Sequence, residues 1–224
     1  MTFAHSCFVS YRHSDRDRTR KFIAELVDAL DDCTDQTMPI SAFHDAARLK
    51  AGFKFNLAIT KALKESVCLI AVLSPEYFQS DYCRREYMGM IEIEAMRREK
   101  TGLPAQEKGL IIPILVWGGD DDVPEEVRNH VHYAKMSYGL TNQRNELKYD
   151  PNWADFLEEI AEQIFSHYKD FSQAKITKKA VDCCNAFQLP ELVDIGYWDK
   201  NVEKSAPPLP GRKRKDGKNS KVTR

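Results

Sequence analysis

The stretch SDYCRREY, residues 80–87, brings three chemically capable side chains close together: the ring of Tyr82, the thiol of Cys83 and the carboxylate of Glu86. A glutamate on a helix is more often a solvated charge than a group that acts on a ligand. A cysteine in this setting is more simply explained as a small buried residue than as a nucleophile. What Glu86 does therefore depends on where the fold places it.

The composition indicates a globular protein of 224 residues, long enough for one domain and an appendage. Charge is unevenly distributed: seven Lys/Arg and one acid between Gly211 and Arg224 give this tail +6, which leaves −7 on the rest. The acidic remainder does not favour nucleic acid as a partner. No apolar run reaches the roughly 20 residues of a membrane helix, and the first 15 residues lack the pattern of a signal peptide. We expect a cytoplasmic location and no membrane partner.

The cysteines indicate reduced thiols rather than disulfides or a zinc site. The six cysteines include no C-x-x-C pair, and Cys7 and Cys68 lie within apolar runs. The acidic run Gly118–Asp122 lacks the spacing of a calcium-binding loop. We therefore expect no bound metal.

Alternating apolar segments predict the fold class. Short apolar runs, typical of strands, alternate with segments whose apolar residues recur at helical spacing. This order predicts an α/β fold: a flavodoxin-like, five-stranded parallel sheet of order 2-1-3-4-5 with helices on both faces. Pro113 in the fourth run suggests an edge strand or a bulge. The predicted strands are residues 6–11, 39–43, 67–74, 109–117 and a short one within 131–138; the helices are 18–32, 57–66, 86–99 and 150–168.

The domain predicted from this pattern covers residues 1–171. Residues 172–204 follow as a helical extension of unknown role, with one more helix possible in KITKKAVDCCNAFQLPEL. Residues 205–224 are rich in proline and then basic, which predicts a disordered tail.

Strand order also predicts the place of a ligand site. Strands one and three are neighbours whose connections leave in opposite directions, and the crevice beyond their carboxyl ends is the expected site in such sheets. Tyr11–Asp15 follows the first of these strands. Ser74–Glu86 follows the other, and Ser74 and Pro75 predict a helix start there. The topology therefore brings Arg12 and Glu86 near one crevice.

Four segments in this order and spacing resemble a Toll/interleukin-1 receptor (TIR) domain, over roughly Ser6 to Tyr168. They are CFVSYRHSD, FHDAARLKAG, ALKESVCLIAVLSPEYFQSDYCRREY and GLIIPILVW. The resemblance implies a flavodoxin-like α/β domain, in agreement with the sheet predicted above.

The resemblance also implies an activity. Enzymatic TIR domains cleave NAD+ at the nicotinamide–ribose bond with a glutamate in the pattern S-x-W-C-x-x-E, which here runs from Ser80 to Glu86 with Tyr82 in place of tryptophan. Nicotinamide leaves as a neutral molecule and the transition state resembles a ribosyl cation, so one carboxylate suffices and no general acid is needed. NAD+ is then the substrate, and no further cofactor is expected. Tyrosine offers less stacking area than tryptophan, which bears on affinity more than on activity.

Further substrate-binding candidates surround this glutamate. Arg12 could bind the pyrophosphate, with an ion pair to Asp15 or Asp45 as its rival role, and Tyr82 could stack on a ring of the dinucleotide or merely pack at the helix start. The loop 44–54, which corresponds to the BB loop of the family, could close over the ligand. The remaining candidates are Tyr11, His13, Phe43, Asp45, Ser74 and Cys83, for which a loop, core or bracing role is the alternative.

The function expected from the resemblance is NAD+ hydrolysis or cyclisation in immune, specifically antiphage, signalling. Self-association through the TIR domain and a partner effector or sensor protein are implied as well. The alternative is a non-catalytic adaptor that acts only by assembling with other TIR domains. Hydrolase and cyclase stay open, since they differ only in which nucleophile meets the ribosyl cation.

Overall fold

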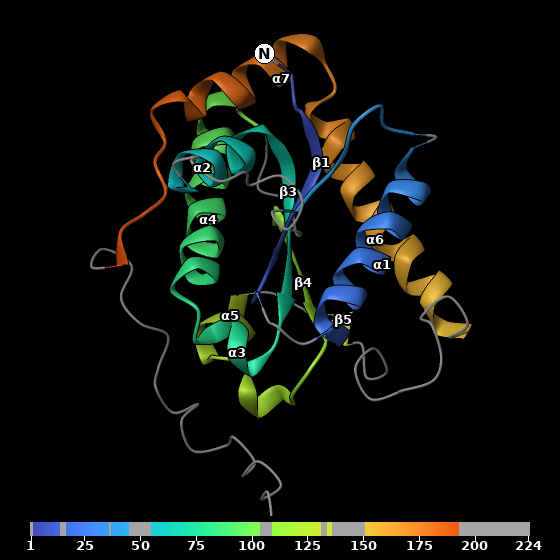
Figure 1. Ribbon diagram of the computed structural model, residues 1–224. Helices are drawn as coiled ribbons and strands as arrows, with labels where there is room; N and C mark the ends of the chain where they lie inside the picture. The colour runs from blue at the N-terminus through green and yellow to red at the C-terminus, as the bar shows by residue number, and fades with distance from the viewer. Residues whose placement is uncertain are drawn as a thin grey trace, which may run out of the picture.

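The computed structural model describes residues 2–13, 17–35, 37–44, 55–103, 109–130, 134–135 and 151–192. A parallel sheet lies at the centre and helices cover both of its faces (Figure 1). The five strands are β1 (His5–Tyr11), β2 (Ser41–Phe43), β3 (Ser66–Leu73), β4 (Ile111–Leu115) and β5 (Ala134–Lys135). They lie in the order β2-β1-β3-β4-β5, which confirms the predicted fold class and strand order.

The two neighbouring strands at the middle of the sheet, β1 and β3, are almost completely buried. All eight residues of β3 are buried, as expected for a strand covered on both faces. β1 runs parallel to it from the pair His5–Ser66 to the pair Tyr11–Val72. Their carboxyl ends therefore finish side by side, and the strand order reverses at this point, which is where such sheets place a ligand.

Pro113 marks neither of the two predicted features. β4 is not an edge strand, because it lies between β3 and β5, and its register with β3 runs without a bulge. The N–H of Leu69 donates to the carbonyl of Leu110, and the N–H of Val116 donates to the carbonyl of Leu73. The main-chain N–H and C=O groups of the even-numbered residues of β4 therefore point toward β3. Pro113 faces the other way. On that side the described residues of β5 pair with Ile114 and Leu115, and a missing N–H at Pro113 costs no ladder bond between the described strands.

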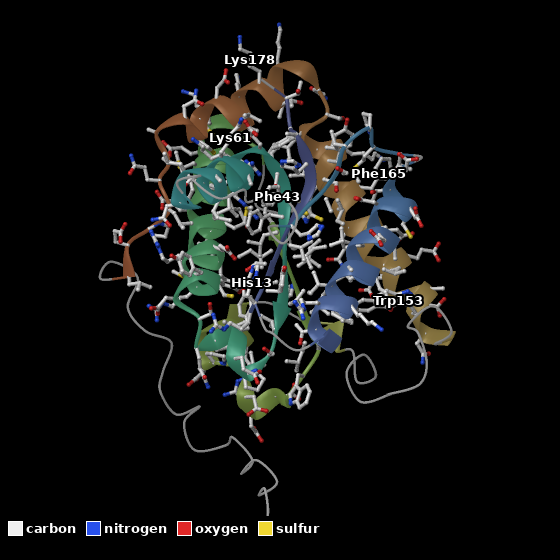
Figure 2. The ribbon with its side chains drawn as sticks, viewed as in Figure 1. His13, Phe43, Lys61, Trp153, Phe165 and Lys178 are labelled. Carbon is white, nitrogen blue, oxygen red and sulfur yellow. The ribbon has the colours of Figure 1, made fainter. Side chains whose placement is uncertain are left out.

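Two long helices cover one face of the sheet. α1 (Asp17–Thr34) and α6 (Pro151–Phe171) pack against each other on the right in Figure 1. Trp153 of α6 is buried with its ring 6.4 Å from that of Phe22 on α1 (Figure 2). Both helices match their predicted positions within a few residues.

The other face carries α2 (Phe55–Glu65) and α4 (Asp81–Thr101), with the short helices α3 (Pro75–Phe78), η2 (Asp120–Asp122) and α5 (Glu125–His130) toward the carboxyl edge. α4 begins at Asp81, five residues earlier than predicted, because Ser80 caps its N-terminus. None of the described helices combines the length and apolar character needed to cross a bilayer.

The C-terminal extension follows α6 directly. α7 (Ala174–Asp182) and η4 (Cys183–Ala186) lie across the end of the domain, and the chain then runs along α4 (Figure 1). The helix predicted over this segment thus ends at Asp182. The proline-rich basic tail lies outside the described residues.

Arg97 of α4 ties this extension to the core. It is 0% exposed, and its guanidinium lies 4.9 Å from the centre of the Phe3 ring. Burial lowers the pKa of Arg97, and main-chain acceptors compensate for the lost water. Its N–H groups donate at 2.8–3.3 Å to the carbonyls of Lys64, Ser66, Val67 and Ala180.

Arg97→Ala is expected to lower the free energy of unfolding by about 3 kcal/mol or more, because four carbonyls lose a charged donor and a cavity replaces the side chain. Arg98→Ala is the matched control on the same helix. Arg98 pairs with Glu94 near the surface, and its loss should cost less than about 1 kcal/mol. Urea unfolding of both variants measures the difference, and equal losses would contradict this role of Arg97.

Candidate functional site

Two serine caps build the segment that carries Glu86. Ser74 caps α3 as predicted, since its hydroxyl accepts a hydrogen bond from the N–H of Tyr77 at 3.1 Å. Ser80 caps α4 and accepts from the N–H of Cys83 at 3.4 Å. The chain leaves β3, makes one turn of helix and enters α4 within eight residues, so Glu86 stays beside the carboxyl edge of the sheet.

Glu86 is a buried carboxylate and not a solvated surface charge. Its residue is 6% exposed, and its Oε2 accepts a hydrogen bond of 2.6 Å from the hydroxyl of Ser10. Ser10 is 1% exposed and lies one residue before the end of β1. The bond is short and joins two residues 76 positions apart in the sequence.

The phenol hydroxyl of Tyr77 orients the hydroxyl of Ser10. The phenol oxygen of Tyr77 lies 3.0 Å from the Ser10 hydroxyl and 3.4 Å from the carbonyl of Cys83. Since Ser10 gives its single hydrogen to Glu86, Tyr77 is the donor to Ser10. Burial raises the pKa of Tyr77 well above its usual value, so the phenol keeps its proton. The result is a chain of donors from Tyr77 through Ser10 to Glu86.

Sequence patterns did not single out Ser10 or Tyr77 as site residues. A polar signal was present in the first strand, because a serine inside a buried apolar run must find a hydrogen-bond partner. The residue in register with Ser10 on β3 is Ala71, which has no polar side chain. The Ser10 hydroxyl must therefore find its partner on another element. That this element is α4 depends on packing, which no local pattern expresses.

Two of the predicted binding residues are exposed at the end of β1. Arg12 and His13 both face solvent, and His13 lies at the carboxyl end of the strand (Figure 2). The ring of Tyr11 is buried and stacks on that of His13 at 4.7 Å. Tyr82, in the first turn of α4, is 46% exposed. An exposed cation and an exposed aromatic ring thus lie on the two segments that border the switch point.

The other predicted binding residues have structural contacts. Phe43 is buried, with its ring 5.2 Å from Phe8 and 5.1 Å from His5. Cys83 is buried inside α4, and Ser74 serves as the cap of α3. Asp45, and all of the loop 44–54 except His44 at its start, lie outside the described residues. Their roles in binding a ligand stay predictions.

The site has the chemistry of a single held carboxylate. A fixed, ionised carboxylate can stabilise a positive charge that develops next to it. The described residues contain no group of three His, Cys, Asp or Glu side chains arranged to hold a metal ion. Each of the six cysteines is free, and burial raises the pKa of Cys7 to about 12, which disfavours its thiolate.

The fold and the edge that carries Glu86 define a flavodoxin-like α/β domain with its candidate site at the strand-order switch. A family model described as the TIR domain matches residues 7–149, well over half of the sequence. The chain belongs to the TIR domain family.

One relative is a resistance protein by name. TMV resistance protein N of Nicotiana glutinosa is 28% identical over 213 residues, which cover 90% of this chain and 16% of that protein. The chain thus spans a small part of the length of this relative.

Two solved structures are similar at lower identity. The TIR domain of the Toll-related receptor TRR-2 from Hydra magnipapillata aligns at 18% identity and a TM-score of 0.44, over 70% of this chain and 98% of that one. The TIR domains of the activated Roq1 resistosome, which directly recognises the pathogen effector XopQ, align at 19% identity and a TM-score of 0.38, over 81% and 84% of the two chains.

Proposed function

We propose that this TIR domain cleaves NAD+ at the nicotinamide–ribose bond. The observation that carries the proposal is Glu86: it completes the S-x-x-C-x-x-E pattern, is buried, and has one carboxylate oxygen held by Ser10 at 2.6 Å. A glutamate that served only as a surface charge would need neither the burial nor the charge-assisted bond. The identity of the substrate is inferred from the TIR family, because its enzymatic members act on NAD+.

In the proposed reaction the glycosidic C–N bond breaks and its electron pair leaves with the neutral nicotinamide. The ribosyl carbon becomes cationic, and the Glu86 carboxylate stabilises this charge. Water then adds to the carbon and releases a proton, which gives ADP-ribose. Attack by a group of the same molecule instead gives a cyclic isomer, and the part of the chain that the structure describes favours neither nucleophile.

Two exposed side chains would hold the rest of the dinucleotide. Arg12 presents a guanidinium, whose geometry suits the oxygens of the pyrophosphate. Tyr82 presents a half-exposed ring at the first turn of α4, four residues before Glu86, on which a ring of NAD+ can stack. Both come from segments that meet at the carboxyl edge, so one ligand can touch them and Glu86.

The biological setting of the proposal is immune signalling in the cytoplasm. TMV resistance protein N is a resistance protein by name, and TIR domains are found in the activated Roq1 resistosome. We extend this role to the present chain as a signalling NADase that works as a self-assembled TIR domain with an effector or sensor partner. A role in antiphage defence is the most specific form of this proposal.

The proposal is tested by incubating the protein with NAD+ and separating the products by liquid chromatography and mass spectrometry. Glu86→Gln keeps the shape of the side chain and an oxygen that can accept from Ser10, but removes the charge. We expect release of nicotinamide to fall by a factor of about 100 or more. Glu92→Gln, at an exposed position of the same helix, is the control and should retain activity.

Both samples are measured dilute and concentrated, because assembly is part of the proposal. The mass of the second product separates ADP-ribose from a cyclic isomer, which is lighter by one water. A fully active Glu86→Gln variant would contradict the role of Glu86. Absence of nicotinamide from the concentrated wild-type protein would favour a TIR adaptor that acts only through assembly.

Tyr82→Trp restores the tryptophan of the family pattern. The larger ring should strengthen stacking, so we expect the KM for NAD+ to fall roughly two- to tenfold while kcat changes little. Steady-state kinetics of wild type, Tyr82→Trp and Tyr82→Ala measure the effect. An unchanged KM in both variants would show that this ring does not touch the substrate.

A further inference from the structure

An extended segment after η4 lies against the helix that carries Glu86. We call residues 187–191 the strap. It follows α7 and η4 and runs along α4 on the side away from the sheet (Figure 1). Within the strap, Phe187 and Leu189 are buried although the segment has no regular secondary structure. Their burial indicates a fitted contact rather than a loose chain end.

Arg85 binds the strap through its guanidinium. Its Nε donates to the carbonyl of Pro190 at 2.6 Å, and its Nη2 lies 3.3 Å from the carboxylate of Glu191 and 3.5 Å from the carbonyl of Leu189. Arg85 is buried, whereas Glu191 is mostly exposed. The main-chain acceptor at 2.6 Å is therefore the dominant partner, since an exposed ion pair contributes little.

Gly89, one turn further along α4, makes room for the strap. A β-carbon at this position would lie 3.0 Å from the ring of Phe187 and 3.5 Å from both Leu189 and Pro190. Glycine inside a helix costs about 1 kcal/mol relative to alanine. A close approach of another segment is the usual reason to keep it, and here that segment is the strap.

Arg97 provides a third attachment of the extension to α4, through the carbonyl of Ala180 in α7. Arg85, Gly89 and Arg97 are separated by four and eight residues, so they follow one ridge of α4. The extension therefore contacts α4 from its fifth turn, which contains Arg97, to its second turn, which contains Arg85 and Glu86.

We propose that Arg85 is a positioning residue that acts through the strap to hold the first turns of α4, and with them Glu86, in the reactive arrangement. The proposal rests on the function proposed above. Consecutive residues of a helix point about 100° apart, so Glu86 contacts β1 while Arg85 contacts the strap. The start of α4 is therefore held from two sides, and a shift of about 1 Å at a catalytic group can lower a rate by a factor of 100.

Three full-length variants release the strap in different ways. Arg85→Ala removes the polar attachment, Phe187→Ala removes the buried ring, and Gly89→Leu fills the space that the ring occupies. Ala95→Leu places the same side chain at an exposed position of α4 and is the matched control. Arg85→Lys keeps the charge and a hydrogen-bonding head group but loses the forked geometry of the guanidinium, and serves as the conservative variant.

The kinetic readout is the split between kcat and KM for NAD+, taken at a temperature where circular dichroism shows every variant folded. We expect the three release variants to lose roughly tenfold or more in kcat, with KM within about threefold of wild type. Ala95→Leu should match wild type and Arg85→Lys should recover part of the loss. The double variant Arg85→Ala/Phe187→Ala should lose no more than the worse single variant, because both act through one strap.

Hydrogen exchange of the amides of residues 81–90 provides a readout that needs no activity. Exchange should be faster in the release variants than in wild type and Ala95→Leu. If wild type releases no nicotinamide, the proposed function fails and this exchange still decides whether the strap holds α4. Unchanged exchange, unchanged kcat in the release variants, or full additivity in the double variant would overturn the proposal.

Discussion

The hydrogen bond from Ser10 to Glu86 is the constraint on which the candidate site depends. It forms only if the last residues of β1 and the second turn of α4 meet, although 76 positions separate them in the sequence. The parallel pairing of β1 with β3 brings the two segments to one edge. The caps at Ser74 and Ser80 then turn the chain so sharply that Glu86 remains there.

Several independent contacts keep α4 where this bond requires it. Tyr77 of α3 forms a hydrogen bond with Ser10, and Arg97 fixes the far end of α4 to four carbonyls of the core and the extension. On the outer side, Arg85 and Gly89 receive the strap. The extension is therefore a structural part of the domain, built onto the helix that carries the candidate catalytic residue.

Much of the fold could be predicted because its strands are short apolar runs separated by helices of clear periodicity. The predicted start of α4 is too late, because the polar residues before Glu86 lack the apolar spacing that indicates a helix. The cap at Ser80 is the feature that marks the first turn. The prediction of an edge strand or a bulge at Pro113 is wrong. In a parallel strand every second N–H faces the same neighbour, so a proline can sit in the interior if its nitrogen faces the side that needs no bond.

The site was predictable only in part. The family pattern and the strand order pointed to Glu86, but its partner Ser10 is one serine within an apolar run, and nothing local connects it to α4. The strap could not be predicted at all. Its main attachment is a main-chain carbonyl of Pro190, which any residue could supply, and the pattern that identifies TIR domains ends before it.

The most direct test of this account is the kcat for NAD+ cleavage in Ser10→Ala, with Ser6→Ala as the control because Ser6 is a buried serine on the same strand. If the hydroxyl holds the carboxylate in place, Ser10→Ala loses roughly tenfold or more in kcat, as expected for a hydrogen bond to a charged group, while KM and the fold are retained. Ser6→Ala keeps the wild-type rate. A Ser10→Ala protein as fast as Ser6→Ala would contradict the account, because Glu86 would then need no partner on β1.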